Sequence, residues 1–321
     1  MIKRICSFVI SGKTLFCLMF LGCLDIDANN NFYGRIAIDA QSISIDNNGT
    51  KSDIANNESK AGLKGSFVFS KSSNLEFIYQ IEYGFDPVDG KARGDDGTLK
   101  QRNTFIGLQT NFGTLFAGTH DSALKKSQLK VDLFNDVSAD IKNILHGENR
   151  LEEFIGFTTP KYKDSISATF NHTKNPLAAG TNFKSYSINY SGDNYQAAFA
   201  VDDGMKGFDS TRLSVLYPHS NFRLGIIVQE TKNLSTGIKK SGGVISYSTR
   251  VQAKGTLKFQ HAISSMKISS GKQSTIGYDH QIKQGLKFFT LFSKLQSDRA
   301  DKNRNIFYIS SHIRINKNHQ I

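Results

Sequence analysis

Residues 60–83 read KAGLKGSFVFSKSSNLEFIYQIEY, two alternating runs separated by a short polar turn. The apolar positions of the first run are Ala61, Leu63, Gly65, Phe67 and Phe69, set against Lys60, Lys64 and Ser66. Those of the second run are Leu75, Phe77, Tyr79, Ile81 and Tyr83, set against Glu76, Gln80 and Glu82, with Ile78 as the exception. A two-residue period places each set on one face of a strand. The stretch therefore predicts two paired strands with one aromatic, apolar face and one charged face.

The composition of the whole chain favours strands joined by turns. Its 321 residues include 24 Phe, 11 Tyr and 27 Gly, but only 4 Pro and no Trp. Aromatic residues are enriched in strands, and proline is depleted there. The mean hydropathy of −0.35 is that of a soluble protein, although the formal net charge is +12.

The first 28 residues have the pattern of a signal peptide. Lys3 and Arg4 form a positive start, an apolar run follows over residues 15–24, and Ala28 precedes a cut at Asn29. Cys23 after Leu21-Gly22 weakly resembles a lipoprotein site, which is the alternative for this segment. All three cysteines of the chain, Cys6, Cys17 and Cys23, lie within it. We expect residues 1–28 to be removed and residues 29–321 to form one domain without disulfides.

Past residue 28 no apolar run approaches the roughly 20 residues of a membrane-spanning helix. An exported chain of this kind is then either soluble or a β-barrel, since a closed barrel is the other structure that satisfies every backbone group in lipid.

The alternation recurs to the C-terminus in sixteen segments. They are 31–45, 59–70, 74–86, 100–110, 113–118, 149–159, 164–172, 182–191, 194–202, 208–217, 221–231, 240–249, 252–263, 271–281, 284–296 and 304–315. The seven connections expected to be short are Ser70–Asn74, Asn111–Gly113, Pro160–Asp164, Gly192–Asp193, Pro218–Asn221, Thr249–Val251 and Ile282–Gln284. The longer ones between them include Asp46–Glu58, Pro87–Leu99, Thr119–Glu148 and Ser297–Asn303. Short turns alternating with longer loops are typical of a transmembrane antiparallel up-and-down barrel.

A soluble β-sandwich or an exported surface adhesin is the alternative fold and function. Such proteins share the alternation but usually have shorter strands and one apolar core between two sheets. Charges in the middle of the polar faces, such as Lys64, Glu76, Lys254 and Lys258, fit the lumen of a barrel and also a solvated face. The strand count favours the barrel. The segment 284–296 is apolar on both faces, so its sequence does not indicate which face meets lipid.

No enzyme chemistry is predicted. The eight histidines are scattered, no Gly-x-Ser-x-Gly or His-Glu-x-x-His motif occurs, and no paired cysteines indicate a metal or cofactor. Interleaved acidic residues and export argue against a nucleic-acid partner.

Several motifs resemble the Gram-negative general porin family, the sixteen-stranded trimeric channels of the outer membrane. The matching segments are Tyr33-Gly34-Arg35, the run from Ser59 to Gly65, the run from Arg102 to Leu108, Asn111-Phe112-Gly113-Thr114-Leu115, Gly118 with Asp121, the run from Val131 to Asp136, Asn149-Arg150, and Gly156-Phe157-Thr158-Thr159-Pro160. The resemblance is dense over residues 59–170 and thin over about 230–300.

The resemblance implies a water-filled channel for passive diffusion of small hydrophilic solutes and ions. It also implies a homotrimer, contact with outer-membrane lipid and lipopolysaccharide, and a third loop folded into the barrel. Acidic loop residues would face a basic wall at the constriction. The wall residues implied by position are Arg35, Lys60, Arg102 and Arg150; the loop acids are Asp132 and Asp136, with Asp140 as a rival.

Two departures from the family pattern bear on these expectations. The Pro-Glu-Phe-Gly-Gly run of enteric members is absent, and the last strand is expected to end at Ile315 rather than at an aromatic residue.

The excess of positive charge predicts a mild preference for anions.

Overall fold

The computed structural model describes residues 29–46, 48–70, 74–88, 99–174, 182–267, 271–297 and 303–318. Most of them are strand. The strands are β1 (Asn29–Ile45), β2 (Gly49–Asn56), β3 (Lys60–Ser70), β4 (Leu75–Gly84), β5 (Lys100–Gln101), β6 (Thr104–Thr110), β7 (Gly113–Asp121), β8 (Arg150–Thr158), β9 (Ile166–Lys174), β10 (Asn182–Ser191), β11 (Gln196–Met205), β12 (Phe208–Pro218), β13 (Phe222–Asn233), β14 (Lys239–Val251), β15 (Gly255–Ser264), β16 (Gly271–Lys283), β17 (Leu286–Ser297) and β18 (Arg304–Asn318). The helices of the described residues are α2 (Ala123–Lys126) and η1 (Ile141–Asn143), both between β7 and β8. None of the described helices is long and apolar enough to cross a membrane.

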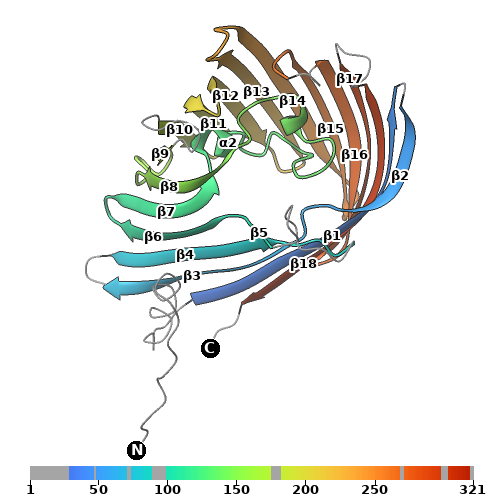
Figure 1. The fold of residues 1–321 in the computed structure, drawn as a ribbon. Helices are drawn as coiled ribbons and strands as arrows, with labels where there is room; N and C mark the ends of the chain where they lie inside the picture. The colour runs from blue at the N-terminus through green and yellow to red at the C-terminus, as the bar shows by residue number, and fades with distance from the viewer. Residues whose placement is uncertain are drawn as a thin grey trace, which may run out of the picture.

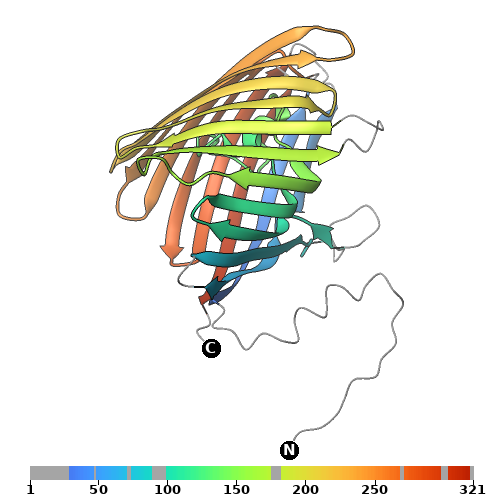
Figure 2. The same ribbon diagram turned by 90° about the vertical axis from the view of Figure 1, so that its left-hand side faces the viewer.

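The strands form one closed antiparallel sheet (Figures 1 and 2). β18 pairs with β1 over its whole length, from Asn318 opposite Asn31 to Arg304 opposite Ile45, and this pairing closes the ring. β2 and β3 lie along β1 one after the other, and β5 and β6 lie along β4 in the same way. Each of these two pairs makes one broken strand, so the eighteen elements form a sixteen-stranded barrel. The predicted fold class is confirmed.

The two-residue period assigns the faces as predicted. The outer face carries exposed apolar side chains, such as Phe199, Leu213 and Val228, which lie directly opposite one another on β11, β12 and β13. On β3 and β4 the aromatic rings of Phe67 and Phe77 pack together, with centroids 4.7 Å apart. Exposed apolar belts of this kind face hydrocarbon in transmembrane barrels.

Some predicted boundaries are wrong. Residues 46–58 are not a loop, because β2 occupies Gly49–Asn56 and pairs with β1 through a tight hairpin. Thr249 and Val251 are paired within β14, and the turn comes after them at residues 252–254, where Gln252 has a φ of +63°. Alternation alone does not mark where a hairpin turns, since a polar strand end and a turn have similar compositions. The last strand continues past Ile315 to Asn318.

The segment 284–296 is apolar on both faces for a structural reason. Phe288 and Phe292 are exposed on the outer face of β17, whereas Phe289, Leu291 and Leu295 are buried on the other face. These inner side chains pack against the connection between β7 and β8. Phe289 and Leu291 belong to a cluster with Phe134 and Val137, and Leu295 to a second cluster that contains Ile141 and Ile144.

Leu213→Arg tests the assignment of the outer face. Leu213 is in the middle of β12 and is 49% exposed between Phe199 and Val228. A lipid-facing Arg is expected to lower the free energy of unfolding by about 2–4 kcal/mol near the midplane. Urea unfolding of the protein folded into lipid vesicles measures this loss. Leu213→Met, which keeps an uncharged side chain at the same position, should remain close to wild type; equal stability of the two variants would show that this face does not meet hydrocarbon.

Candidate functional site

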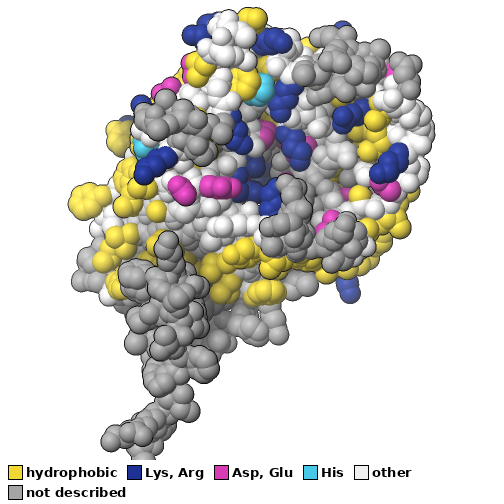
Figure 3. All heavy atoms as spheres, viewed as in Figure 1, with side chains coloured by type: hydrophobic (Ala, Val, Ile, Leu, Met, Phe, Trp, Pro, Cys, Tyr) yellow, Lys and Arg dark blue, Asp and Glu magenta, His cyan; other side chains and the backbone are white. Residues whose placement is uncertain are grey.

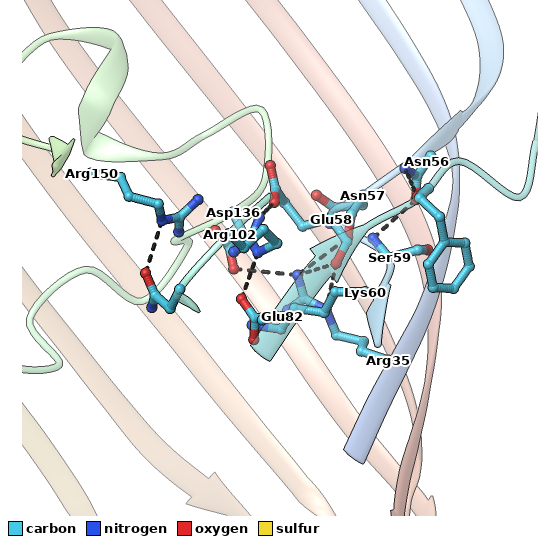
Figure 4. A network of polar contacts seen from close by, with 12 residues as sticks. Arg35, Asn56, Asn57, Glu58, Ser59, Lys60, Glu82, Arg102, Asp136 and Arg150 are labelled. Atoms are coloured by element: carbon cyan, nitrogen blue, oxygen red, sulfur yellow. Dashed lines mark hydrogen bonds and ion pairs between the residues drawn. The ribbon is translucent and has the colours of Figure 1, made fainter. Parts of the chain in front are cut away.

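Arg35 lies beside the break between β2 and β3, and that break supplies its hydrogen-bond acceptors (Figure 4). The guanidinium donates from Nη2 to the carbonyl oxygens of Glu58 (2.9 Å) and Asn57 (3.4 Å), and from Nε to that of Glu58 (3.2 Å). Glu58 has a left-handed backbone with φ of +60°. The interruption of the strand thus frees carbonyl groups that would otherwise bond within the sheet, and these carbonyls accept hydrogen bonds from Arg35 instead.

Asp136, from the connection between β7 and β8, reaches the same arginine. Its Oδ2 lies 3.3 Å from Arg35 Nη2, with the two side chains 25% and 12% exposed. The backbone N–H of Asp136 donates to Asp140 Oδ2 at 2.9 Å, and Asp140 also forms an ion pair with Lys142 at 3.4 Å. Asp140 therefore shapes the loop behind Asp136.

Arg102 lies at the second break, between β5 and β6. Its backbone N–H bonds to the carbonyl of Glu82 at 2.8 Å, and its Nε lies 2.8 Å from Glu82 Oε1. Its Nη1 pairs with the Glu58 carboxylate. Lys60 Nζ lies 3.0 Å from Glu82 Oε2, to which Tyr33 also donates its hydroxyl proton at 2.9 Å. Glu82 is 2% exposed and is the shared partner of Tyr33, Lys60 and Arg102.

These contacts join six ionised side chains into what we call the charge network: Arg35, Glu58, Lys60, Glu82, Arg102 and Asp136. Arg150 lies to one side of it in Figure 4. Its Nε donates to Asn103 at 2.9 Å and pairs with Asp121 at 3.2 Å, a carboxylate that Lys125 also contacts at 3.1 Å. Each of the four predicted wall cations therefore has a carboxylate partner.

Asp132 lies elsewhere, within the connection and against β15. Its carboxylate accepts hydrogen bonds from the backbone N–H of Phe134 (2.9 Å) and Ile141 (3.3 Å) and from Gln260 Nε2 (3.1 Å). Burial, and then the charge of Asp140, raise the pKa of this carboxyl well above its usual range. The structure thus brings Asp136 to the predicted wall cations and gives Asp132 a different set of partners.

The sequence reading did not single out three residues that organise the site. The sequence places Glu82 only on the polar face of the second strand, and it places Glu58 in a predicted loop where the structure has a strand and a break. Arg212 was missed altogether. It is fully buried on β12, pairs with Glu148 Oε1 at 2.9 Å, and donates to Gln229 (2.8 Å) and to the carbonyls of His146 (3.0 Å) and Leu124 (3.2 Å). The sequence indicates Arg212 only as a charged residue within a strand whose apolar residues alternate with polar ones.

A second set of charges lies on β15, β16 and β17. Asp279 is shared by Lys258 (2.8 Å) and Lys287 (2.9 Å), and Lys258 also donates to the carbonyl of Leu133 in the connection at 3.2 Å. Figure 3 shows Lys and Arg side chains gathered around a hollow, with Asp and Glu side chains among them. Within the described residues, the charge network and these neighbouring pairs comprise seven cations and five carboxylates. No group of three or more potential metal ligands occurs in the described part of the chain.

Comparisons with known proteins agree with this architecture. A family model described as Gram-negative porin matches residues 26–300. The fold is similar to that of an anion-selective porin from Comamonas acidovorans, with 17% identity and a TM-score of 0.72 over 90% of this chain and 100% of that one. It is also similar to the trimer form of OmpT, an outer-membrane protein of Vibrio cholerae (10% identity, TM-score 0.66, 90% and 99% covered), and to a triple mutant of Rhodopseudomonas blastica porin (13%, 0.65, 90% and 100%). No curated protein sequence gives a significant match. The chain belongs to the Gram-negative porin family and is a multi-pass β-barrel protein of the outer membrane.

Proposed function

We propose that the protein is a water-filled channel through which small hydrophilic solutes and ions diffuse passively, without a chemical reaction or a cofactor. The observation that carries this proposal is the placement of the charge network on a closed barrel whose outer face is apolar. Charged side chains are tolerated in a membrane barrel when they line an aqueous interior. An enzyme would instead need a nucleophile and a base directed at a substrate, whereas each carboxylate of the network is paired with a cation.

We further propose that the connection between β7 and β8 folds inward and narrows the lumen. Support comes from its contacts with the polar faces of the strands. Gln260 accepts from the backbone N–H of Leu133 at 2.8 Å, and Gln273 donates to the carbonyl of Ala139 at 2.5 Å. In Figure 1 the connection is drawn within the ring of strands. Because Asp136 projects from this segment to Arg35, the constriction would carry carboxylates on one side and cations on the other.

Opposed charges across a narrow passage orient water and dipolar solutes, and low-dielectric walls concentrate their field. Salt screens such a field over about 8–10 Å. Seven cations sharing five carboxylates leave the described pairs with an excess of positive charge. We therefore propose a mild preference for anions, in line with the structural similarity to an anion-selective porin from Comamonas acidovorans.

Three further features are proposed for this chain. A homotrimer is supported by the trimer form of one structural neighbour. Outer-membrane lipid and lipopolysaccharide would surround it. Cleavage before Asn29 would remove a signal peptide, although residues 1–28 lie outside the described residues.

Planar-bilayer recording tests the channel itself. Purified protein that migrates as a heat-modifiable folded barrel should give stepwise ohmic conductance. A correctly inserted barrel that conducts nothing would rule out the proposal and favour a structural or adhesive role.

Arg102→Ala is predicted to enlarge single-channel conductance and to weaken the anion preference. Removing this guanidinium takes a cation from the proposed constriction and leaves the Glu58 and Glu82 carboxylates with less neutralisation. The reversal potential in a tenfold KCl gradient should move toward the cation-selective side. Lys239→Ala is the matched control, because Lys239 is exposed and pairs only with Glu230 among the described residues. Unchanged conductance and selectivity in Arg102→Ala would remove this residue from the constriction.

Arg212 and Glu148 are predicted to hold both ends of the connection against β12. Removing one partner leaves the other buried and uncompensated, which typically costs about 3–5 kcal/mol. Arg212→Met should therefore speed proteolytic cleavage within residues 123–148 and increase current noise. The double variant Arg212→Met/Glu148→Gln should recover part of the loss, since no buried charge is left unpaired. Additive effects of the two substitutions would show that the pair does not act as a unit.

Asp132 is predicted to give the protein a pH-dependent stability. Its pKa is higher in the folded state than the unfolded value of about 3.9, so the native state binds the extra proton. The stability from this group is complete below about pH 4 and is lost as pH rises through the folded pKa. The difference in unfolding free energy between wild type and Asp132→Asn should accordingly decrease from pH 4 to pH 7 in urea titrations. Asp193→Asn, at an exposed turn, is the control for replacing an aspartate by asparagine; an increase with pH for Asp132→Asn would contradict the assignment.

A further inference from the structure

A cavity of about 430 Å³ lies apart from the charge network, at the end of the barrel where the longer connections are found. Its lining comes from the end of the β7–β8 connection, from β11 and β12 with the turn between them, and from the segment after β15. Pockets that bind small molecules in proteins typically measure about 300–1,000 Å³. None of the six members of the charge network lines this cavity.

Two buried carboxylates at this cavity have oxygen atoms without partners. Asp202 is 1% exposed, and the donors nearest to its carboxylate are the side chains of Ser185 and Asn149; neither forms a hydrogen bond of normal length and angle with it. Glu148 uses Oε1 for Arg212, while its Oε2 is buried and equally without a donor. A buried carboxylate oxygen without a donor is costly, so its presence calls for a cation or a donor from outside the chain.

Three lysines from three different segments line the same cavity. Lys142 comes from η1, Lys206 from the turn between β11 and β12, and Lys267 from the segment after β15. Lys142 and Lys206 are exposed, and the half-buried Lys267 donates to the carbonyl of Lys142 at 2.5 Å. Burial, together with the charges of Lys142 and Lys206, lowers the pKa of Lys267, which places these ammonium groups within electrostatic reach of one another. The cations thus lie at the exposed edge and the carboxylates at the buried floor.

An apolar wall completes the cavity. The imidazole of His146 stacks on the ring of Phe208, with centroids 4.1 Å apart and the planes inclined by 26°. Burial lowers the pKa of His146, so this side chain is neutral at pH 7 and adds no further positive charge. The stacked pair therefore offers a flat surface between the acidic floor and the basic edge.

We propose that this cavity is a binding site for a small zwitterion of the amino-acid class. The ammonium group of the ligand lies at the floor, where Asp202 and Glu148 supply the unpartnered oxygens. Its carboxylate lies at the edge, between Lys206 and Lys267. A simple anion would pair with the lysines but be repelled by the two carboxylates. A simple cation would pair with the carboxylates but be repelled by the three lysines. Only a molecule with separated charges of both signs satisfies both ends.

This site adds selectivity to passive diffusion, because a zwitterion that binds near the loops is concentrated at one end of the barrel. The inference does not depend on conduction: binding is measured on the folded protein in detergent.

Calorimetric titration with three ligands that each contain four carbon atoms tests the proposal. γ-Aminobutyrate is the zwitterion, butyrate the anion and butylammonium the cation, each titrated into the full barrel after heat-modifiability confirms folding. γ-Aminobutyrate is expected to bind at least tenfold more tightly than either of the others. Asp202→Asn should weaken that binding at least tenfold. Asp203→Asn is the matched control, since Asp203 is the next residue of β11, is exposed, pairs with Lys184 at 3.8 Å and does not line the cavity.

Lys206→Gln provides a second variant at an exposed turn, where folding is not at risk, and it should also weaken γ-aminobutyrate binding. Equal binding of butyrate and γ-aminobutyrate would overturn the proposal in favour of a plain anion site. Binding of none of the three would show that the cavity holds only water. Loss of binding in Asp203→Asn as large as in Asp202→Asn would show that the effect is not local to the cavity.

Discussion

The structure depends on closing the backbone hydrogen bonds of a sheet in a solvent that offers none. In hydrocarbon each unpaired N–H or C=O costs several kcal/mol, so a spanning sheet has to be free of edges. The pairing of β1 with β18 removes the two edges that a chain of sixteen strands would otherwise expose. Once the ring is closed, every strand has an inside and an outside, and the two-residue period decides which side chains take each position. The charges of Lys60, Glu82 and Arg102 then converge because no other face accepts them.

The charge network is built where the barrel wall is interrupted. Arg35 binds carbonyl groups freed between β2 and β3, and Arg102 lies between β5 and β6. In an unbroken strand these carbonyls would pair with neighbouring strands. The left-handed backbone of Glu58 turns its carbonyl toward Arg35 while its carboxylate pairs with Arg102, so one residue serves both cations. Local loss of regular pairing therefore provides the ligands that hold the arginines in place.

Much of the fold can be predicted from the sequence because alternation is a local property. The outward side chains of β3 and β4 and the closed barrel of sixteen strands follow from residues close together along the chain. The hairpin before β2 could not be predicted, since Asp46–Glu58 is polar whether it forms a strand or a loop. The partners of Asp132 and Arg212 were equally out of reach: Gln260 is 128 residues from Asp132, and Glu148 is 64 residues from Arg212. Family position pointed to Arg35 and Asp136, which do meet, but it did not name Glu58 and Glu82, the carboxylates that pair with Arg102 and Lys60.

The two apolar faces of β17 have a consequence for how the chain is assembled. Phe289 and Leu291 are covered by Phe134 and Val137, residues from a segment more than a hundred positions earlier. Contacts of such high sequence separation form late and slowly. Until β17 makes these contacts with the β7–β8 connection, it therefore exposes apolar side chains on both faces, and neither lipid nor water is a good solvent for both faces at once. A periplasmic holding factor that shields this strand would have more to protect here than in a barrel whose strands each have one polar face.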